Sequence, residues 1–272
     1  MKVHIRTIII VIAAAVFAFS GYKIISNLSE RKEAENAYAD IASQAVLVVT
    51  PAAESNTGSG ATPSAETSSE VDINNPPISV NFEMLKKQNS NVAGWLYCAG
   101  TPINYPVVRC DDSADYSYYE SHTFSGKKNS SGSIFTDYRN TDLFNDYNSI
   151  LYGHSMKNGT MFAYMLRYTN QDFYNSHKYL WLLTETDIYR VDIIGAINVD
   201  GNAEEYVIPK NKAELDTLIS AFVSGSPFRS DVNIASVEKT IMFSTCAYNG
   251  EERRIIVLGS LMKINKDIDK SF

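Results

Sequence analysis

Cysteine is scarce in this chain: Cys98, Cys110 and Cys246 are the only three among 272 residues. The paired spacings that mark zinc sites or a disulfide framework are absent, so neither is expected to hold the fold together. At most one disulfide can form. A Cys98–Cys110 bridge stays open, because the sequence does not give the separation of the two Cα atoms.

Basic residues are also few, with 24 Lys and Arg against 31 Asp and Glu and a formal net charge of −7. No basic stripe is present to neutralise phosphates, which argues against a nucleic-acid partner. Internal repeats are absent. A hydrophobic content of 44% is enough for a real core, so we expect one soluble domain with appendages.

Long apolar runs are absent except at the N-terminus. Residues 7–25 contain one charged side chain, Lys23, whose long stem can reach the membrane surface. The run is long enough to span a bilayer, and we expect an uncleaved transmembrane signal-anchor. A cleaved signal peptide is the alternative, but Ile24 and Ile25 continue the run where a small-residue cleavage site is needed.

Composition divides the remaining chain. We expect a cytoplasmic N-terminus at 1–6, a juxtamembrane helix at 26–50, a disordered Ser/Thr/Pro-rich linker at 51–78 and a folded domain at 79–272. Basic residues flank the span on both sides, so the positive-inside count does not decide its orientation. The polar linker is typical of a domain held off a membrane surface, so we expect a single-pass protein with its folded domain outside the cell.

The folded domain is rich in short apolar runs with Ile, Val and Tyr, punctuated by turn residues, which predicts an all-β barrel or sandwich. Helices are expected at 81–88, at 161–168 and at 212–224, the last between an N-cap at Asn211 and a stop at Gly225. Strands are predicted at 94–97, 105–108, 133–137, 149–152, 179–183, 188–194, 240–245 and 255–262.

Cys246 is the candidate nucleophile. It ends an apolar strand, and the residues at 247–250 (Ala-Tyr-Asn-Gly) predict a turn into a second strand. Such a hairpin brings Arg254 beside the thiol, where a guanidinium can stabilise an oxyanion. Arg253 is assigned to the opposite face, because side chains alternate along a strand.

His154 is the candidate acid and base among four histidines. It follows a predicted strand through Gly153, which permits a sharp turn at the mouth of a barrel. His4 precedes the apolar run, whereas His122 and His177 lie in polar loops, where exposed histidines are common.

Three strings together resemble the signature of sortases, the transpeptidases that attach surface proteins to the Gram-positive cell wall. They are Tyr-Gly-His at 152–154, Ser-Thr-Cys at 244–246, and Arg254. The resemblance covers roughly residues 82–264. Further strings at 94–96, 103–108, 132–140 and 158–162, and the long insert between His154 and Cys246, are similar to class B members.

This resemblance implies an eight-stranded sortase β-barrel with N-terminal and inserted helices, preceded by the transmembrane helix and the tether. It implies that Cys246 cleaves a C-terminal LPXTG- or NPQTN-like sorting signal after Thr through a thioacyl enzyme, with His154 as acid and base and Arg254 at the oxyanion. Ser244 and Tyr152 are implied to line the substrate pocket. The implied partners are surface proteins and a peptidoglycan cross-bridge or stem-peptide amine, and neither a cofactor nor a metal is implied.

Three alternatives stay open. A pilin-polymerising sortase differs in using a pilin lysine as the acceptor. A hydrolytic cysteine protease uses the same residue types, although the chain lacks the order of Cys before His of papain-like enzymes and the caspase Gln-Ala-Cys string. A wall-tethered binding domain would share the barrel without using Cys246.

Overall fold

The computed structural model describes residues 2–49, 75–112, 114, 118–200, 206–246 and 253–264. For Cys246 and Arg253 the description covers the backbone. Most of the predicted linker at 51–78 and the predicted turn at 247–250 lie outside the described residues.

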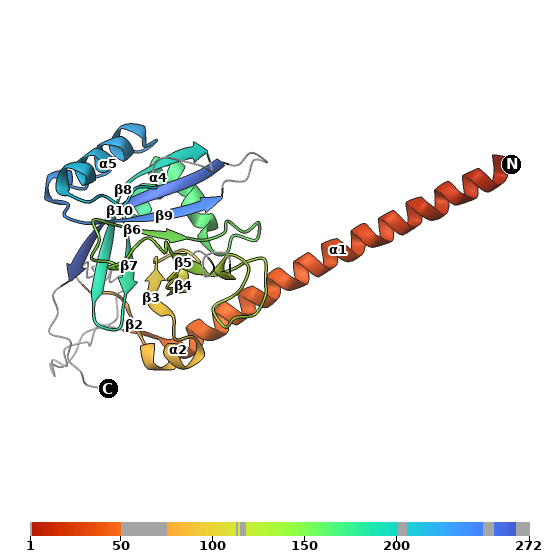
Figure 1. The fold of residues 1–272 in the computed structure, drawn as a ribbon, viewed down its shortest axis with the longest axis horizontal. Coiled ribbons are helices and arrows are strands. Elements are labelled where there is room, and N and C mark those ends of the chain that lie inside the picture. Colours follow the sequence, from red (N-terminus) through yellow and green to blue (C-terminus); the bar gives the residue numbers. More distant parts are fainter. Residues whose placement is uncertain are drawn as a thin grey trace, which may run out of the picture.

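The centre of the fold is a closed barrel with strand order β10-β8-β7-β3-β4-β5-β6-β9 (Figure 1). Two neighbouring pairs are parallel, β4 with β5 and β6 with β9, and the others are antiparallel. All the predicted strands are present, which confirms the expected barrel. They are β3 (Val92–Tyr97), β4 (Asn104–Val108), β5 (Ile134–Thr136), β6 (Asn148–Tyr152), β7 (Tyr179–Leu183), β8 (Ile188–Asp200), β9 (Thr240–Cys246) and β10 (Arg253–Ile264).

The strand β8 continues past its predicted end at 194 and pairs with β10 along its whole length. The predicted strand stopped before Gly195, which has a different role in the structure. A Cβ at this position would lie 2.7 Å from the carbonyl oxygen of Phe222, so the glycine lets α5 (Lys212–Gly225) approach the strand closely.

Two helices form as the sequence predicts. The helix α2 (Phe82–Gln88) is capped by the side chain of Asn81, and α5 is capped by Asn211, whose Oδ1 accepts from the amide of Glu214 at 3.0 Å. The expected apolar face of α5 is buried, and it covers β8 on the outside of the barrel (Figure 1). Its buried residues are Leu215, Leu218, Ile219 and Phe222.

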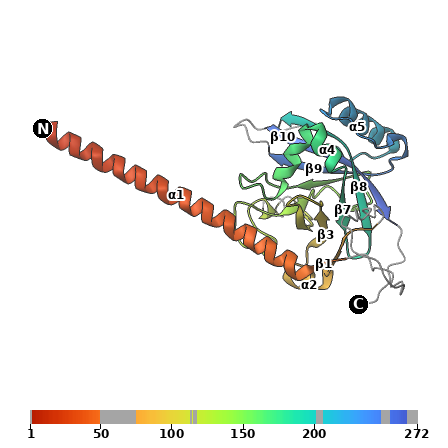
Figure 2. The same cartoon turned by 180° about the vertical axis from the view of Figure 1, so that it is seen from behind.

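The predicted helix at 161–168 is a 3₁₀ helix, η1 (Phe162–Thr169). Its buried residues Phe162, Met165 and Tyr168 are spaced by three, as the tighter helix requires. The element packs against β8, β9 and β10. It is followed by α4 (Gln171–Ser176), which was not predicted and lies in front of the barrel in Figure 2. A short 3₁₀ turn, η2 (Ile234–Ser236), precedes β9.

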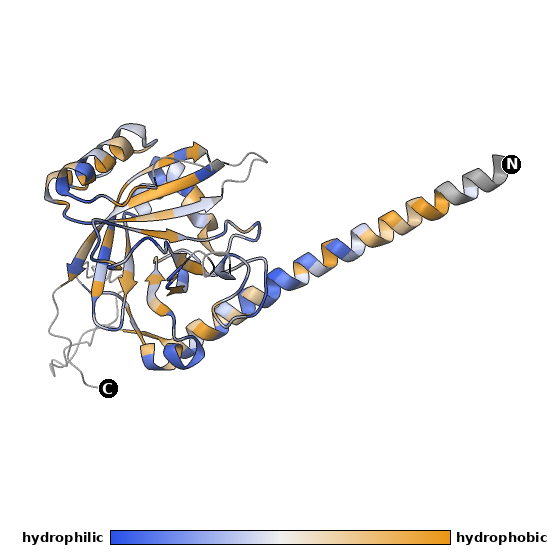
Figure 3. Ribbon diagram, viewed as in Figure 1, coloured by the Kyte–Doolittle hydropathy of each residue, from blue (hydrophilic) through white to orange (hydrophobic). Residues whose placement is uncertain are grey.

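One continuous helix, α1 (Lys2–Ala45), replaces the separate anchor and juxtamembrane helices expected from composition. Over residues 10–45 it is long and apolar enough to cross a membrane, by length and composition. Figure 3 shows its apolar part projecting away from the barrel and its polar part beginning nearer the barrel. Ile10, Phe17 and Ile25 are exposed, which fits a surface meant for lipid.

The C-terminal part of α1 belongs to the folded core. Tyr38, Ile41 and Ala45 are buried in the same cluster as the barrel side chains. The strand β1 (Val46–Val48) then pairs with β2 (Ile78–Val80), so the linker starts and ends at the same two-stranded sheet. The linker was expected to hold the domain off the membrane. Because its ends are paired, α1 sets the distance between the apolar run and the barrel instead.

The open question of a Cys98–Cys110 bridge is answered by the structure, in which both cysteines are buried and neither is in a disulfide. Burial raises the pKa of the Cys98 thiol to about 11. This thiol therefore stays protonated and packs as a small apolar side chain.

Replacement of Ile41 by Ala tests whether α1 is part of the fold. We expect the free energy of unfolding to fall by about 2–5 kcal/mol, because the change leaves a cavity between helix and barrel. Leu28→Ala is the control on the same helix, since Leu28 is 59% exposed. Urea unfolding of the full chain in detergent can be followed by the fluorescence of Trp95 and Trp181, both buried in the barrel. Equal stability of the two variants would contradict the docking of α1.

Candidate active site

His154 lies just beyond the end of β6, beside the end of β9. The two strands are parallel, with Tyr152 opposite Ser244, and the amide of Gly153 donates to the carbonyl of Ser244 at 3.2 Å. The pairing ends at these two residues, and His154 and Cys246 each follow two residues later in the chain. That the imidazole and the thiol meet stays a prediction.

At position 153 the core leaves no room for a side chain, so glycine is required there. It was expected to permit a sharp turn, but it is not among the glycines with positive φ. A Cβ would lie 2.5 Å from Cδ1 of Ile134 and 2.8 Å from Cδ2 of Phe162. The residue before His154 is therefore wedged between two core side chains, which fixes where the histidine leaves the strand.

Cys246 and Arg254 are opposite each other in the antiparallel pair of β9 and β10. Paired positions share one face of a sheet, so positions 246 and 254 belong to the same face. Arg254 is half-buried. Position 253 is one residue earlier and by alternation belongs to the other face. The two strands of the expected hairpin, β9 and β10, are paired in the structure.

The imidazole of His154 is oriented by a backbone carbonyl. Its Nε2 lies 2.8 Å from the oxygen of Glu120, and the ring is half-buried. A carbonyl only accepts, so Nε2 carries the hydrogen in the neutral ring, and proton exchange falls to Nδ1. The sequence reasoning missed Glu120, because its contribution is a backbone atom that no motif marks.

His122 and His177 were expected to be exposed loop histidines, but both are partly buried and held by structural contacts. His122 stacks on Tyr118 with ring centroids 3.9 Å apart, and His177 stacks on Phe173 at 4.2 Å. In both, Nδ1 lies within hydrogen-bond distance of a backbone carbonyl in the same turn.

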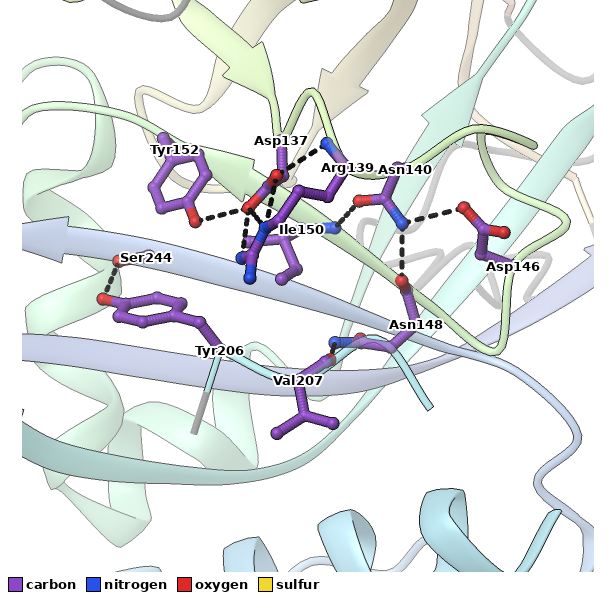
Figure 4. Close-up of polar contacts among 10 residues, drawn as sticks. All are labelled: Asp137, Arg139, Asn140, Asp146, Asn148, Ile150, Tyr152, Tyr206, Val207 and Ser244. Atoms are coloured by element: carbon purple, nitrogen blue, oxygen red, sulfur yellow. Dashed lines mark hydrogen bonds and ion pairs between the residues drawn. The ribbon is translucent and has the colours of Figure 1, made fainter. Parts of the chain in front are cut away.

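Tyr152 and Ser244 are buried, and their hydroxyl groups are bonded within the protein (Figure 4). Tyr152 donates to Oδ2 of Asp137 at 2.8 Å, and Ser244 shares a hydrogen bond with the hydroxyl of Tyr206 at 2.7 Å. The tyrosine rings lie 5.9 Å apart. A substrate-lining role for Tyr152 and Ser244 stays a prediction.

Asp137 is a buried carboxylate that the sequence reasoning did not single out. Oδ2 accepts from Nη2 of Arg139 at 2.6 Å, and Oδ1 accepts from the backbone amide of Arg139 at 2.8 Å. Burial raises the pKa of Asp137, but the hydrogen bonds from Arg139 and Tyr152 outweigh it, so the pKa lies below its usual value. The carboxylate is therefore ionised at neutral pH and holds Tyr152 in place.

Asn140 and Asn148 connect this network to the neighbouring strands (Figure 4). The side chain of Asn140 accepts from the amide of Ile150 at 2.9 Å and donates to the carbonyl of Asn148 at 2.8 Å. The side chain of Asn148 donates to the carbonyl of Val207 at 2.9 Å. Buried amides bonded in this way fix the backbone of β6.

No metal site accompanies these residues in the described part of the chain. Within the ranges that the structure describes, no group of three or more His, Cys, Asp or Glu side chains is placed to hold an ion.

Comparison with known proteins gives the family. Sortase B of Listeria monocytogenes is 30% identical over 255 residues, which cover 92% of this chain and 94% of that protein. The structure of a Staphylococcus aureus sortase B–substrate complex is 30% identical with a TM-score of 0.61, covering 68% of this chain and 85% of the other. A structure of sortase B complexed with triglycine is 31% identical with a TM-score of 0.60, covering 68% and 86%.

No family model matches the chain. The barrel and these relatives place it among the cysteine transpeptidases. The chain belongs to the sortase B family.

Loss of the Asp137 carboxylate should remove part of the pH dependence of stability. Because the pKa of Asp137 is lowered on folding, its stabilisation is complete above the unfolded pKa of about 4 and is lost as pH falls through the folded pKa. We expect Asp137→Asn to be less stable by about 1–3 kcal/mol at pH 7 and to lose less stability between pH 5 and 3 than wild type.

Urea unfolding at each pH measures both effects. Asp111→Asn is the control, because it removes the solvent-exposed ion pair of Asp111 with Arg109, and such pairs contribute about 0–1 kcal/mol. Parallel pH profiles for wild type and Asp137→Asn would contradict the assignment.

Proposed function

We propose that this protein is a membrane-anchored transpeptidase that cleaves a C-terminal LPXTG- or NPQTN-like sorting signal after its threonine and transfers the upstream protein to a peptidoglycan amine. The observation that carries this is the backbone register, which pairs Cys246 with Arg254 and pairs Tyr152, two residues before His154, with Ser244, two residues before Cys246. The S. aureus relative solved with a substrate and the sortase B solved with triglycine support both halves of the reaction.

In the first half, the sulfur of Cys246 attacks the carbonyl carbon of the threonine. The thiol proton passes to Nδ1 of His154, and the oxyanion forms on the side of the carbonyl that faces Arg254. Because this charge appears only after attack, the guanidinium stabilises the transition state more than the bound substrate. The C–N bond then breaks, His154 protonates the leaving amine, and a thioester to Cys246 is left.

In the second half, an amine attacks the thioester. Nδ1 of His154 takes the proton from the incoming amine, the C–S bond breaks, and a new amide is released. The hydrogen on Nε2 stays in its bond to the Glu120 carbonyl in both halves. One ring nitrogen therefore serves as acid and base while the other fixes the ring.

Tyr152 and Ser244 are assigned to the substrate site, since they pair with each other two residues before His154 and Cys246. Their hydroxyls are bonded to Asp137 and Tyr206, so we infer that they shape the site through their position. The exposed apolar part of α1 supports a single-pass anchor with the barrel outside the membrane.

A covalent intermediate on Cys246 tests the proposed function. Full-length protein mixed with a peptide containing NPQTN or LPXTG should gain the mass of the peptide up to its threonine, and Cys246→Ala should gain none. Added triglycine should then give the amide product. Free acid in the presence of triglycine would indicate a hydrolase, and transfer to a pilin lysine alone would indicate polymerisation. If no adduct forms with either peptide, the proposed function is wrong.

A pair of arginine variants tests the register. Arg254→Gln should lower kcat/KM for transpeptidation by about 10²–10³, the usual cost of one oxyanion donor. Arg253→Gln removes the same charge one residue earlier and should keep kcat/KM within about twofold, because alternation along β10 assigns position 253 to the face opposite Arg254. Rates are measured with a fluorogenic peptide. Equal losses would show that net charge, and not the paired position, matters.

A further inference from the structure

We propose that the helix α1 orients His154, with Tyr38 as a positioning residue that acts through Gly132 and the carbonyl of Glu120. The inference rests on the proposed function of His154 as acid and base. It links the helix that carries the apolar run to the ring that moves the proton. Figure 1 shows the loop between β4 and β5, which contains Glu120 and Gly132, lying beside α1.

The first contact is the bond from Nε2 of His154 to the oxygen of Glu120 at 2.8 Å. A ring nitrogen bonded to a backbone carbonyl ties the direction of the ring to that peptide group. A small shift of the carbonyl rotates the imidazole, and proton transfer is sensitive to such misplacement. The position of the Glu120 peptide is therefore part of the proposed catalytic geometry.

The second contact holds that peptide in place. Gly132 has a φ of +57°, and a Cβ on it would lie 2.6 Å from the Glu120 oxygen and 2.8 Å from the Tyr119 oxygen. The backbone of Gly132 thus packs directly against the carbonyl that His154 uses. The next amide, of Ser133, donates to the Tyr119 oxygen at 2.9 Å, so the two segments are also hydrogen-bonded.

The third contact comes from α1. The hydroxyl of Tyr38 donates to the Gly132 carbonyl at 2.6 Å and accepts from the amide of Phe124 at 3.2 Å. Tyr38 is 4% exposed, and burial raises its pKa to about 12, so it stays a donor at working pH. One buried hydroxyl therefore joins the helix to both arms of the loop that carries Glu120.

Other contacts of α1 hold the same loop and the loop after His154. The side-chain carboxylate of Glu30 accepts from the amide of Ser130 at 2.7 Å. The backbone carbonyl of Glu30 accepts from the side chain of Asn129 at 2.9 Å. The side chain of Asn158, four residues after His154, donates to Glu35 at 3.3 Å. Among these contacts of α1, that of the Tyr38 hydroxyl can be removed by deleting a single oxygen atom, as in Tyr38→Phe.

The test compares Tyr38→Phe with Tyr168→Phe in the full chain in detergent. Tyr168 is an equally buried tyrosine whose hydroxyl donates to the His177 carbonyl at 2.7 Å, so its variant loses the same kind of bond elsewhere. With fluorogenic NPQTN and LPXTG peptides and triglycine, Tyr38→Phe should lower kcat about tenfold and leave KM within about twofold. Tyr168→Phe should leave kcat within about twofold.

A second measurement does not depend on activity. Spectra of ¹⁵N-labelled histidine, with His154 assigned from a His154→Gln sample, report the tautomer of the ring. We expect the Nε2–H form in wild type and in Tyr168→Phe, and a mixture of tautomers in Tyr38→Phe.

The outcomes separate the two hypotheses. If wild type transfers the peptide and Tyr38→Phe matches it in kcat and in tautomer, the inference is overturned while the proposed function stands. Equal losses of kcat in both variants also overturn it, because they indicate a general effect of stability. If wild type transfers neither peptide, the proposed function fails, and the tautomer in Tyr38→Phe alone decides whether α1 orients the ring.

Discussion

The placement of β9 between β6 and β10 is the constraint on which the rest of the structure depends. β9 pairs in parallel with β6 and antiparallel with β10, so a single strand fixes the register of the segment that leads into His154 and that of Arg254. Side chains alternate along a strand, and a slip by one residue in either pairing would turn a required side chain to the opposite face. The barrel is closed, so both edges of β9 are paired and such a slip has no free edge to start from.

Polar side chains hold this register at both ends of the β6 and β9 pair. At the start, the hydroxyl of Thr240 donates to the side chain of Asn148 at 3.0 Å, and the amide of Thr240 donates to the Tyr147 carbonyl at 2.9 Å. At the far end, Tyr152 and Ser244 bond to side chains from other segments. Buried polar groups that are satisfied in only one arrangement are costly in any other, so they specify the pairing more sharply than apolar packing does.

Much of the fold could be predicted from the sequence because periodicity and caps are local signals. The strands, the cap at Asn211 and the apolar face of α5 depend on residues within one element. What could not be predicted is set by distant contacts. Gly195 allows the close approach of α5 and does not end β8. Tyr38 lies in a segment whose sequence predicts only a polar helix, and its buried role depends on its bond to Gly132. The Glu120 carbonyl carries no side-chain signal at all, although it determines which nitrogen of His154 carries the hydrogen.

The continuity of α1 connects the N-terminal apolar run directly to the loops around His154. A flexible tether would isolate the barrel from the membrane, because disordered residues do not transmit orientation. Here the linker leaves from β1 and returns to β2, its pairing partner, and the connection from the apolar run to the barrel is a single helix. That helix contacts the loops on both sides of His154 through Glu30, Glu35 and Tyr38. Its tilt and its distance from the barrel are therefore fixed by the same contacts that position the loop around the imidazole.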